Sequence, residues 1–444
     1  MRRTERKTLG ADYRKLFAAT TISNLGDGVG VIAYPWLASA ITRNPLLIAL
    51  IAAAQRLPWL VFTLPAGVYT DRHDRRRLMI GANAARAVLT AIVGVAVLAR
   101  QDVIPAPDQL EQVVGTEWLL YLFLLVATML LGTCEVIYDN SAQTFLPAIV
   151  ATTDLERANG RMYSAELVAN QFAGPPLAGL LLLVAFAVPV FFDAASFAAS
   201  AALVFAIAAT PPVTAAPQRQ PFRRELAEGF SWLWRHDVIR TLALALAGLN
   251  LLGNMSTAVL VIYAQEVLDT SVAEFTAFSI VSAIGGIVGG WMASWVSRRV
   301  GSGTTLALTL WVSAVASILI AFTTSWLVAA LLLFVWLYTG VLWNVITVSF
   351  RQAVIPDRLL GRVNSVYRFF GWGVIPIGAA LGGLLVVVLE GPLSRDWALR
   401  MPWLVAGIAQ LALAAWAVPR LTTSKLEAAR AGTGITRAAD ASPR

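Results

Sequence analysis

Ionisable residues inside apolar runs are the residues of this sequence that could do chemistry. Asp27 lies eleven residues into the first long apolar run, and Arg56 lies ten residues into the second. A charge at mid-depth in a bilayer costs at least about 2.5–3.5 kcal/mol, so each is a functional candidate. We expect Asp27 to bind and release a proton, controlled by burial and by the proximity of Arg56. The alternative is a static ion pair that fixes two helices.

Further ionisable residues lie nearer the ends of apolar runs. Glu135 and Glu166 lie about one turn inside the predicted inner ends of two runs, and Arg86 lies at a comparable depth. These side chains either line a vestibule open to the cytoplasm or are simply solvated. Asp193, close to the predicted outer start of a run, is expected at the membrane interface. The proton-coupling candidates are Asp27, Arg56, Glu135 and Glu166.

Polar and aromatic side chains are candidates for a substrate cavity. The second half has little charge at mid-span and carries amides such as Asn250 and Gln410 instead, so we expect proton coupling in the first half. Aromatic residues such as Trp372 either stack on a bulky substrate or anchor helices at the lipid interface. The substrate-cavity candidates are Tyr34, Arg86, Asn250, Asn254, Trp343, Asn344, Tyr367 and Arg368.

Composition places these residues in a membrane protein. Of 444 residues, 58% are hydrophobic and 14% are charged, against about 25% charged in a soluble chain. Basic residues sit at the ends of apolar runs and form no stripe, which disfavours a soluble enzyme, a disordered chain and a nucleic-acid binder. With Cys134 alone and two histidines 163 residues apart, no intrachain disulfide, metal site or cofactor is expected.

Apolar runs of about 20 residues each predict transmembrane helices. Twelve can be read, with approximate limits 16–41, 46–69, 78–99, 118–138, 162–184, 188–209, 239–264, 275–296, 305–323, 326–350, 363–389 and 401–418. The fold class is therefore an all-α integral membrane protein. With the N-terminus inside, 27 Lys and Arg residues fall in inner segments and four in outer ones, so both termini are expected in the cytoplasm.

The longest inner connection divides the chain into two halves. We expect a cytoplasmic segment over 1–15, a six-helix bundle over 16–209, a linker over 210–238, a second bundle over 239–419 and a tail over 420–444. Helical spacing of apolar residues over 222–236 predicts an amphipathic helix, either on the inner membrane face or as a plain linker. Arg157 and Asn159 recur as Arg362 and Asn364 at one offset of 205, which indicates a parallel internal repeat.

The sharpest motif joins the second and third runs and reads Gly67-Val-Tyr-Thr-Asp71-Arg72-His-Asp74-Arg75-Arg76-Arg77-Leu78. It resembles the signature loop of the major facilitator superfamily. Asp74 replaces a glycine, a departure shared by the branch that resembles bacterial enterobactin and macrolide exporters. The resemblance implies two pseudo-symmetric six-helix bundles and a charged gate in which Arg75 pairs with an acid of the fourth span. The gate candidates are Gly67, Asp71, Arg72, Arg75 and Asp139; a solvated loop that only sets topology is the alternative.

A second motif lies in the fifth run. Asn170, Gly174, Pro175 and Gly179 resemble the antiporter signature of the same superfamily, although Asn170 stands where the family has glycine. Proline removes a backbone donor and kinks the helix, and glycine permits close approach of a neighbouring helix.

Together these features predict a secondary transporter and no enzyme. We expect proton-coupled efflux of amphipathic, drug-like small molecules across the cytoplasmic membrane by alternating access. The expected partners are a small-molecule substrate, protons and the lipid bilayer, without nucleic acid, and the chain is expected to be a monomer. A siderophore or metabolite exporter of the same fold is one alternative, and a non-transporting membrane receptor or scaffold is another.

Overall fold

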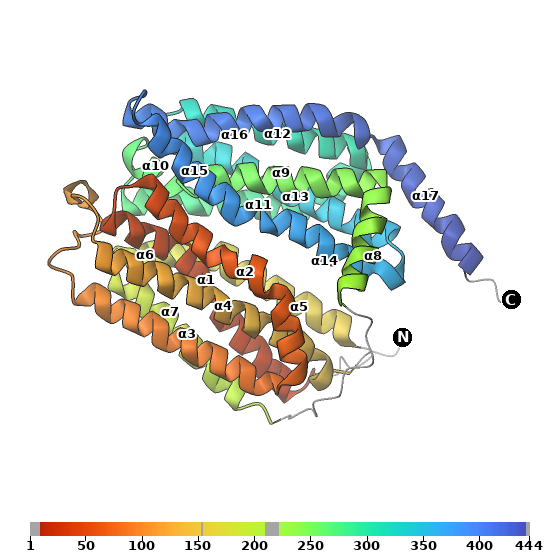
Figure 1. Cartoon of the computed structure of the whole chain (residues 1–444), viewed down its shortest axis with the longest axis horizontal. Coiled ribbons are helices and arrows are strands. Elements are labelled where there is room, and N and C mark those ends of the chain that lie inside the picture. Colours follow the sequence, from red (N-terminus) through yellow and green to blue (C-terminus); the bar gives the residue numbers. More distant parts are fainter. Residues whose placement is uncertain (1–8, 152–153, 209–221, 441–444) are drawn as a thin grey trace, which may run out of the picture. The chain divides into compact units, whose positions relative to one another are not determined.

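The protein is built from long helices, shown in Figure 1. The computed structural model describes residues 9–151, 154–208 and 222–440, and no strand occurs among them. The helices of the first half are α1 (Ala11–Ile41), α2 (Pro45–Arg72), α3 (Arg75–Leu98), η1 (Leu110–Gln112), α4 (Trp118–Ile149), α5 (Leu155–Leu167), η3 (Val168–Ala173), α6 (Gly174–Leu182) and α7 (Ala187–Phe205).

The second half is also helical throughout its described length. Its helices are α8 (Phe222–Arg235), α9 (Asp237–Thr257), α10 (Leu260–Glu266), α11 (Val272–Val300), α12 (Ser302–Phe322), α13 (Trp326–Val354), α14 (Asp357–Gly373), α15 (Ile375–Leu389), α16 (Arg395–Ala417), η4 (Val418–Arg420) and α17 (Thr423–Asp440).

Eleven helices in the described ranges are long and apolar enough to cross a membrane. They correspond to eleven of the twelve predicted runs. The remaining run, 162–184, is built from three consecutive helical pieces, α5, η3 and α6, none of which is long enough by itself. Two of the eleven spans also consist of consecutive α-helices, α9 with α10 and α14 with α15. The expected all-helical membrane fold is therefore present, with its fifth span interrupted.

The chain divides into two compact units. The first comprises Met1–Arg43 and Ala54–Pro217, and the second comprises Asn44–Ala53 and Gln218–Arg444. In the first unit α7 packs against both α1 and α3, and α3 packs against α4. In the second unit α13 packs against α11 and α12, while α16 packs against α9 and α12.

The predicted linker helix is α8, and it packs on α14 within the second unit. Leu233 belongs to the buried core of that unit and Leu226 packs against it. Glu228 forms an ion pair with Arg362 of α14. A side chain on Gly229 would lie 2.6 Å from the carbonyl oxygen of Arg362, so the two backbones are in close contact. These contacts make α8 part of the second unit's core and not only a helix on a membrane surface.

The interruption of the fifth span lies at its two prolines. Because Pro175 and Pro176 carry no N–H, the turn before them cannot complete its usual hydrogen bonds, and Val168–Ala173 adopts the wider π-helical form. Such turns often occur at functional positions. Here the Nδ2 of Asn170 faces α1 and donates to the Oδ1 of Asn24 at 3.4 Å.

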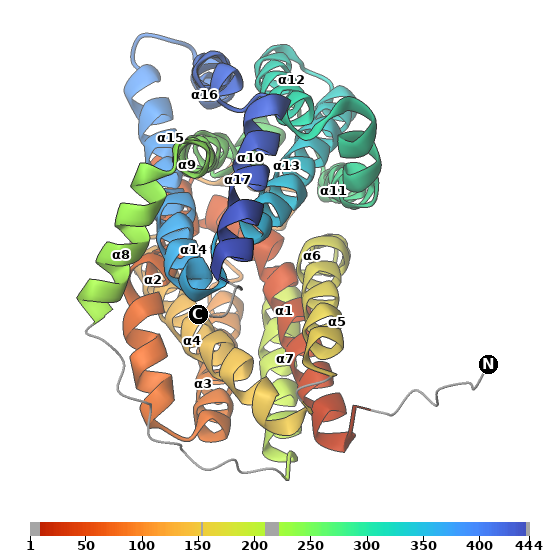
Figure 2. The same ribbon diagram turned by 90° about the vertical axis from the view of Figure 1, so that its right-hand side faces the viewer.

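Glycines bring the fifth span close to α1, which runs beside α5 and α6 in Figure 2. A Cβ on Gly28 would lie 2.7 Å from the carbonyl oxygens of Ala169 and Asn170. One on Gly174 would overlap the backbone of Gly28 and lie 2.8 Å from the amide nitrogen of Val29. Gly28 and the motif residue Gly174 therefore form a backbone-to-backbone crossing, as the sequence suggested for Gly174.

We expect Gly174→Ala to destabilise the first unit by about 1–3 kcal/mol, because the added methyl meets rigid backbone and has no flexible side chain to displace. Thermal unfolding of the purified protein in detergent measures this. Gly160→Ala is the matched control on α5, since a Cβ there has no atom within 4 Å. Equal unfolding temperatures for the two variants would contradict the crossing.

Candidate functional site

Arg86 of α3 is the centre of a buried polar cluster in the first unit. Its side chain is 2% exposed, and its Nη2 forms an ion pair with Asp27 of α1. Its Nη1 donates to the Oγ of Ser23 at 3.3 Å and to the Oδ1 of Asn83 at 3.4 Å. The guanidinium also stacks over the ring of Phe197, 3.8 Å from the centroid. Arg86 is thus fixed by polar partners on two helices and an aromatic face on a third.

A second carboxylate, Asp193 of α7, belongs to the same cluster. It is 2% exposed and accepts a hydrogen bond from the hydroxyl of Tyr34 at 3.0 Å, while its Oδ1 has no hydrogen-bond partner among the described residues. A Cβ on Gly26 would overlap Asp193 and Ser196, so this glycine leaves the room that α7 occupies. The sequence suggested the membrane interface for Asp193; within the first unit its side chain is buried, because α7 turns it toward α1.

The cluster surrounds a very small cavity. In the part of the chain that the structure describes, it is lined by three carboxylates, Asp27, Glu135 and Asp193, and by one guanidinium, Arg86. Its volume is about 10 Å³, which is room for about one water molecule. With all three acids ionised, one arginine would leave two uncompensated negative charges in a nearly dry site, which is costly. The arrangement is therefore suited to holding a proton.

The predicted partner of Asp27 is corrected by the structure. Arg56 lies on α2 with an exposed side chain, and Arg86, expected only as a vestibule or cavity residue, forms the ion pair instead. Glu166 of α5 is also exposed and does not line the small cavity. The sequence does contain a signal for the Arg86 cluster, since a spacing of three places Asn83 and Arg86 on one face of a helix.

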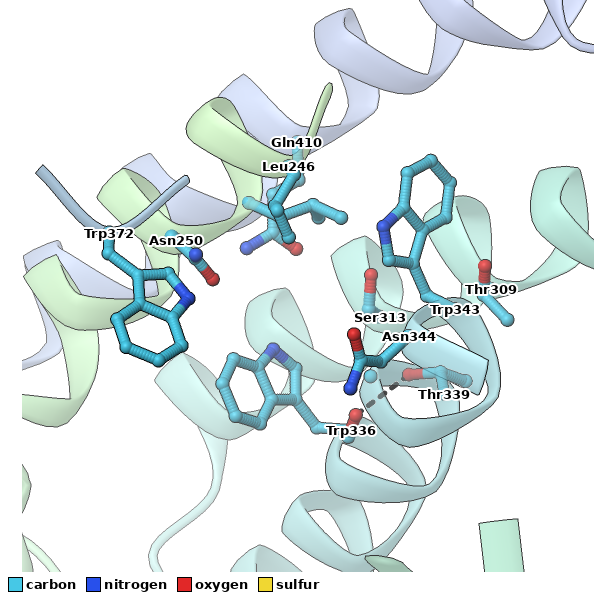
Figure 3. A pocket seen from close by; sticks show the side chains of 12 residues that line it. Leu246, Asn250, Thr309, Ser313, Trp336, Thr339, Trp343, Asn344, Trp372 and Gln410 are labelled. Atoms are coloured by element: carbon cyan, nitrogen blue, oxygen red, sulfur yellow. Dashed lines mark hydrogen bonds between the residues drawn. The ribbon is translucent and has the colours of Figure 1, made fainter. Parts of the chain in front are cut away.

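The second unit contains an uncharged pocket of about 280 Å³, shown in Figure 3. Asn250, Trp343 and Asn344, three of the predicted cavity residues, line it. Trp336 and the hydroxyl residues Thr309, Ser313 and Thr339 are not among the predicted cavity residues. A spacing of seven nevertheless places Trp336 and Trp343 on one face of α13. The lining residues are Leu246, Leu249, Asn250, Thr309, Ser313, Trp336, Thr339, Gly340, Trp343, Asn344, Trp372 and Gln410.

Three other predicted cavity residues do not line this pocket and make packing contacts instead. The Nδ2 of Asn254 donates to the carbonyl of Asn250 at 2.8 Å, one turn away on α9. Tyr367 is 1% exposed, and the guanidinium of Arg351 stacks over its ring at 3.8 Å. Arg368 stacks on Trp372 at 4.4 Å. The other two predicted residues, Tyr34 and Arg86, belong to the charged cluster of the first unit.

A sequence profile described as Major Facilitator Superfamily matches residues 16–379. The chain belongs to the major facilitator superfamily. It is therefore a membrane transporter with a small-molecule substrate and not an enzyme, as the sequence predicted.

Two related proteins align with this chain along most of their length. The multidrug efflux pump Tap of Mycolicibacterium fortuitum is 25% identical over 403 residues, covering 88% of this chain and 93% of that protein. Tap of Mycobacterium tuberculosis (strain ATCC 25618 / H37Rv) is 26% identical over 417 residues, covering 91% and 94%.

Solved transporter structures have the same fold. A bacterial homologue of the human lysosomal transporter Spinster superposes with a TM-score of 0.72 at 14% identity, covering 94% of this chain and 98% of that one. A bacterial homologue of the iron transporter ferroportin gives 0.66 at 17% identity, covering 92% and 100%. At such identities the comparison supports the fold alone.

The major facilitator signature loop ties α3 to its neighbours. Asp74 is the N-cap of α3 and accepts from the amides of Arg76 and Arg77 at 2.9 and 3.2 Å, which satisfies donors that begin the helix. The Nη1 of Arg75 donates to the carbonyl of Thr144 on α4 at 3.0 Å.

The predicted gate is described only in part. Thr144 lies five residues beyond Asp139 on α4, so Arg75 does reach the helix that carries its predicted partner. The surroundings of Gly67 and the side chains of Asp71 and Arg72 lie outside the part that the structure describes.

We expect Arg86→Leu to destabilise the protein by about 3–5 kcal/mol, because it leaves Asp27 buried without its partner. Unfolding in a graded denaturant, followed by near-ultraviolet circular dichroism, measures this. Arg56→Leu is the control and should change stability by less than about 0.5 kcal/mol, since that side chain is exposed. Similar losses in both variants would show that Arg86 is not the structural partner of Asp27.

Proposed function

We propose that this chain exports amphipathic, drug-like small molecules across the cytoplasmic membrane in exchange for protons. The observation that carries the proposal is the excess of carboxylates over arginine around the small cavity of the first unit, three against one. Proton uptake by one of these acids halves the uncompensated charge, and ionisation restores it, so the cluster can hold a proton in one conformation and release it in another.

Asp27 is the acid to which we assign proton exchange. Its side chain is 15% exposed, whereas Asp193 is 2% exposed and held by Tyr34. A proton that enters and leaves in every cycle needs access, and Asp27 has more of it. When Asp27 is neutral its attraction for Arg86 is weakened, which alters the contact between α1 and α3. Glu135 lines the same cavity and is the second candidate acid.

Export as the direction of transport is supported by the relatives. Both Tap proteins are named multidrug efflux pumps and align with about nine-tenths of this chain. The driving force is sufficient, because one proton gains about 1.4 kcal/mol per pH unit and about 2.3 kcal/mol per 100 mV.

The proposal also covers the signature loop and the orientation of the chain in the membrane. We assign Gly67, Asp71, Arg72, Arg75 and Asp139 to a charged latch at the cytoplasmic side, with both termini in the cytoplasm and the chain acting as a monomer. The packing of Arg75 onto α4 supports the latch. The exposed residues Arg56 and Glu166 are proposed to lie on the route by which protons reach or leave the cluster, since neither is held inside it.

Asp27→Asn tests the proposal in inside-out membrane vesicles, where an exporter accumulates a fluorescent dye such as Hoechst 33342 when the lumen is acidified. We expect accumulation driven by the pH gradient to fall at least about tenfold, because asparagine cannot carry a proton. Exchange of dye across the membrane without a gradient should persist. Glu111→Gln, at an exposed position of η1, is the matched control with normal uptake.

Protein level and unfolding temperature are measured for both variants, so that a folding defect is recognised. Gradient-driven uptake by Asp27→Asn equal to that of the control would remove Asp27 from the coupling step. Uptake by the unmodified chain that resists an uncoupler would reject proton coupling altogether.

A further inference from the structure

The pocket of the second unit has polar groups that the protein itself leaves unsatisfied. Gln410 of α16 is 1% exposed, and neither its Nε2 nor its Oε1 has a hydrogen-bond partner among the described residues. The Nε1 of Trp343, whose side chain is 2% exposed, is also without a partner there. Buried amides and indoles in proteins are nearly always hydrogen-bonded, so these groups are available to a molecule in the pocket.

Aromatic surfaces surround these polar groups. Figure 3 shows the indoles of Trp336, Trp343 and Trp372 around the space, with the Gln410 amide turned toward it. Indole faces stack favourably on flat ring systems. The pocket therefore offers stacking surfaces together with the buried amide edge of Gln410.

The hydroxyl groups of the lining are engaged in their own helices. Thr309, Ser313 and Thr339 each donate to a main-chain carbonyl of the preceding turn, at 2.8, 3.1 and 2.8 Å. A hydroxyl that donates in this way can still accept a hydrogen bond but supplies no further donor. Among the lining residues, the buried donors without a hydrogen-bond partner in the described part of the chain are the Nε2 of Gln410 and the Nε1 of Trp343.

No charged side chain lines this pocket in the described part of the chain. The guanidinium of Arg368 stacks on the lining residue Trp372 at 4.4 Å, so a cation of the protein itself already occupies part of this indole surface. A cationic ligand would find aromatic faces but no carboxylate to balance its charge, and an anion would find no buried cation in the lining. The lining consequently favours a neutral ligand.

We infer that this pocket binds the uncharged, planar, aromatic part of a substrate whose edge carries an amide-type N–H and C=O pair. The Gln410 amide matches such an edge with one donor and one acceptor, and the Trp343 N–H supplies a second donor to the carbonyl. The volume of about 280 Å³ lies at the small end of ligand pockets, which fits one fused ring system and not a whole macrocycle. The inference deepens the proposed export function by naming the chemistry of its substrate.

Three probes of the same ring skeleton test this on the full chain in lipid nanodiscs. They are 6(5H)-phenanthridinone, which is neutral and has adjacent N–H and C=O groups, its N-methyl derivative, and the cation 5-methylphenanthridinium. Equilibrium binding is measured by probe fluorescence without any gradient. We expect phenanthridinone to bind about tenfold more tightly than either other probe, since one or two net hydrogen bonds separate them.

Variants assign the effect to the pocket. Gln410→Leu should abolish the tenfold preference for phenanthridinone over its N-methyl derivative, and Trp343→Phe should weaken binding of both about threefold while retaining an aromatic face. Gln352→Leu makes the same chemical change on an exposed position of α13 outside the pocket and should bind as the unmodified chain does. The comparison of probes on the unmodified chain needs no variant, so it holds even where Gln410→Leu fails to fold.

Equal or tighter binding of 5-methylphenanthridinium would overturn the inference, and so would equal binding of the N-methyl derivative, an unchanged preference in Gln410→Leu, or no binding of phenanthridinone. Because binding is measured without a gradient, these results are separate from the coupling test. Loss of gradient-driven uptake in Asp27→Asn together with no probe binding would retain the exporter and reject the pocket's assignment. Specific probe binding with unchanged uptake in that variant would do the reverse.

Discussion

The ion pair of Arg86 and Asp27 is the interaction on which the first unit depends. A charge inside a membrane protein needs a partner, and here the partners lie on different helices, α1 and α3. Glycines let α1 pack closely against α7 beside this ion pair, since a Cβ on Gly26 would overlap residues of α7. Gly30 lets the ring of Tyr34 lie back along α1, 2.9 Å from where a Cβ would be. The Asp27–Arg86 pair is therefore buried at a place where glycines of α1 allow close packing.

The sequence shows how far along its apolar run each ionisable residue lies, but not the direction in which its side chain faces. Asp27 and Arg56 are both at mid-run, yet only Asp27 is in the cluster, because helix rotation is decided by packing. Arg86 and Asp193 appeared nearer the ends of their runs, and the packing of α7 against both α1 and α3 brings both toward the interior of the first unit. Hydropathy gives position along the membrane normal, whereas rotation depends on contacts between segments far apart in the sequence.

The spans themselves were predictable because twenty apolar residues have few other stable arrangements. The π-helical turn at Val168–Ala173 was not, although Pro175 and Pro176 predicted a kink. In the second unit Asn250 and Trp343, both predicted cavity residues, line a pocket. Tyr367, of the same residue class, packs on Arg351 instead, since an aromatic side chain serves equally well as core, cation partner or ligand surface.

The chemistry of the two units differs in a way that constrains coupling. The cavity of the first unit is lined by carboxylates and an arginine, whereas the described lining of the pocket in the second is uncharged. A neutral ligand bound in the second unit has no charge with which to displace a proton from Asp27. In the exchange that we propose, competition of proton and substrate for one carboxylate is then not the coupling step. Proton and substrate would instead be linked through the conformational equilibrium, which each ligand biases by binding one state more tightly than the other.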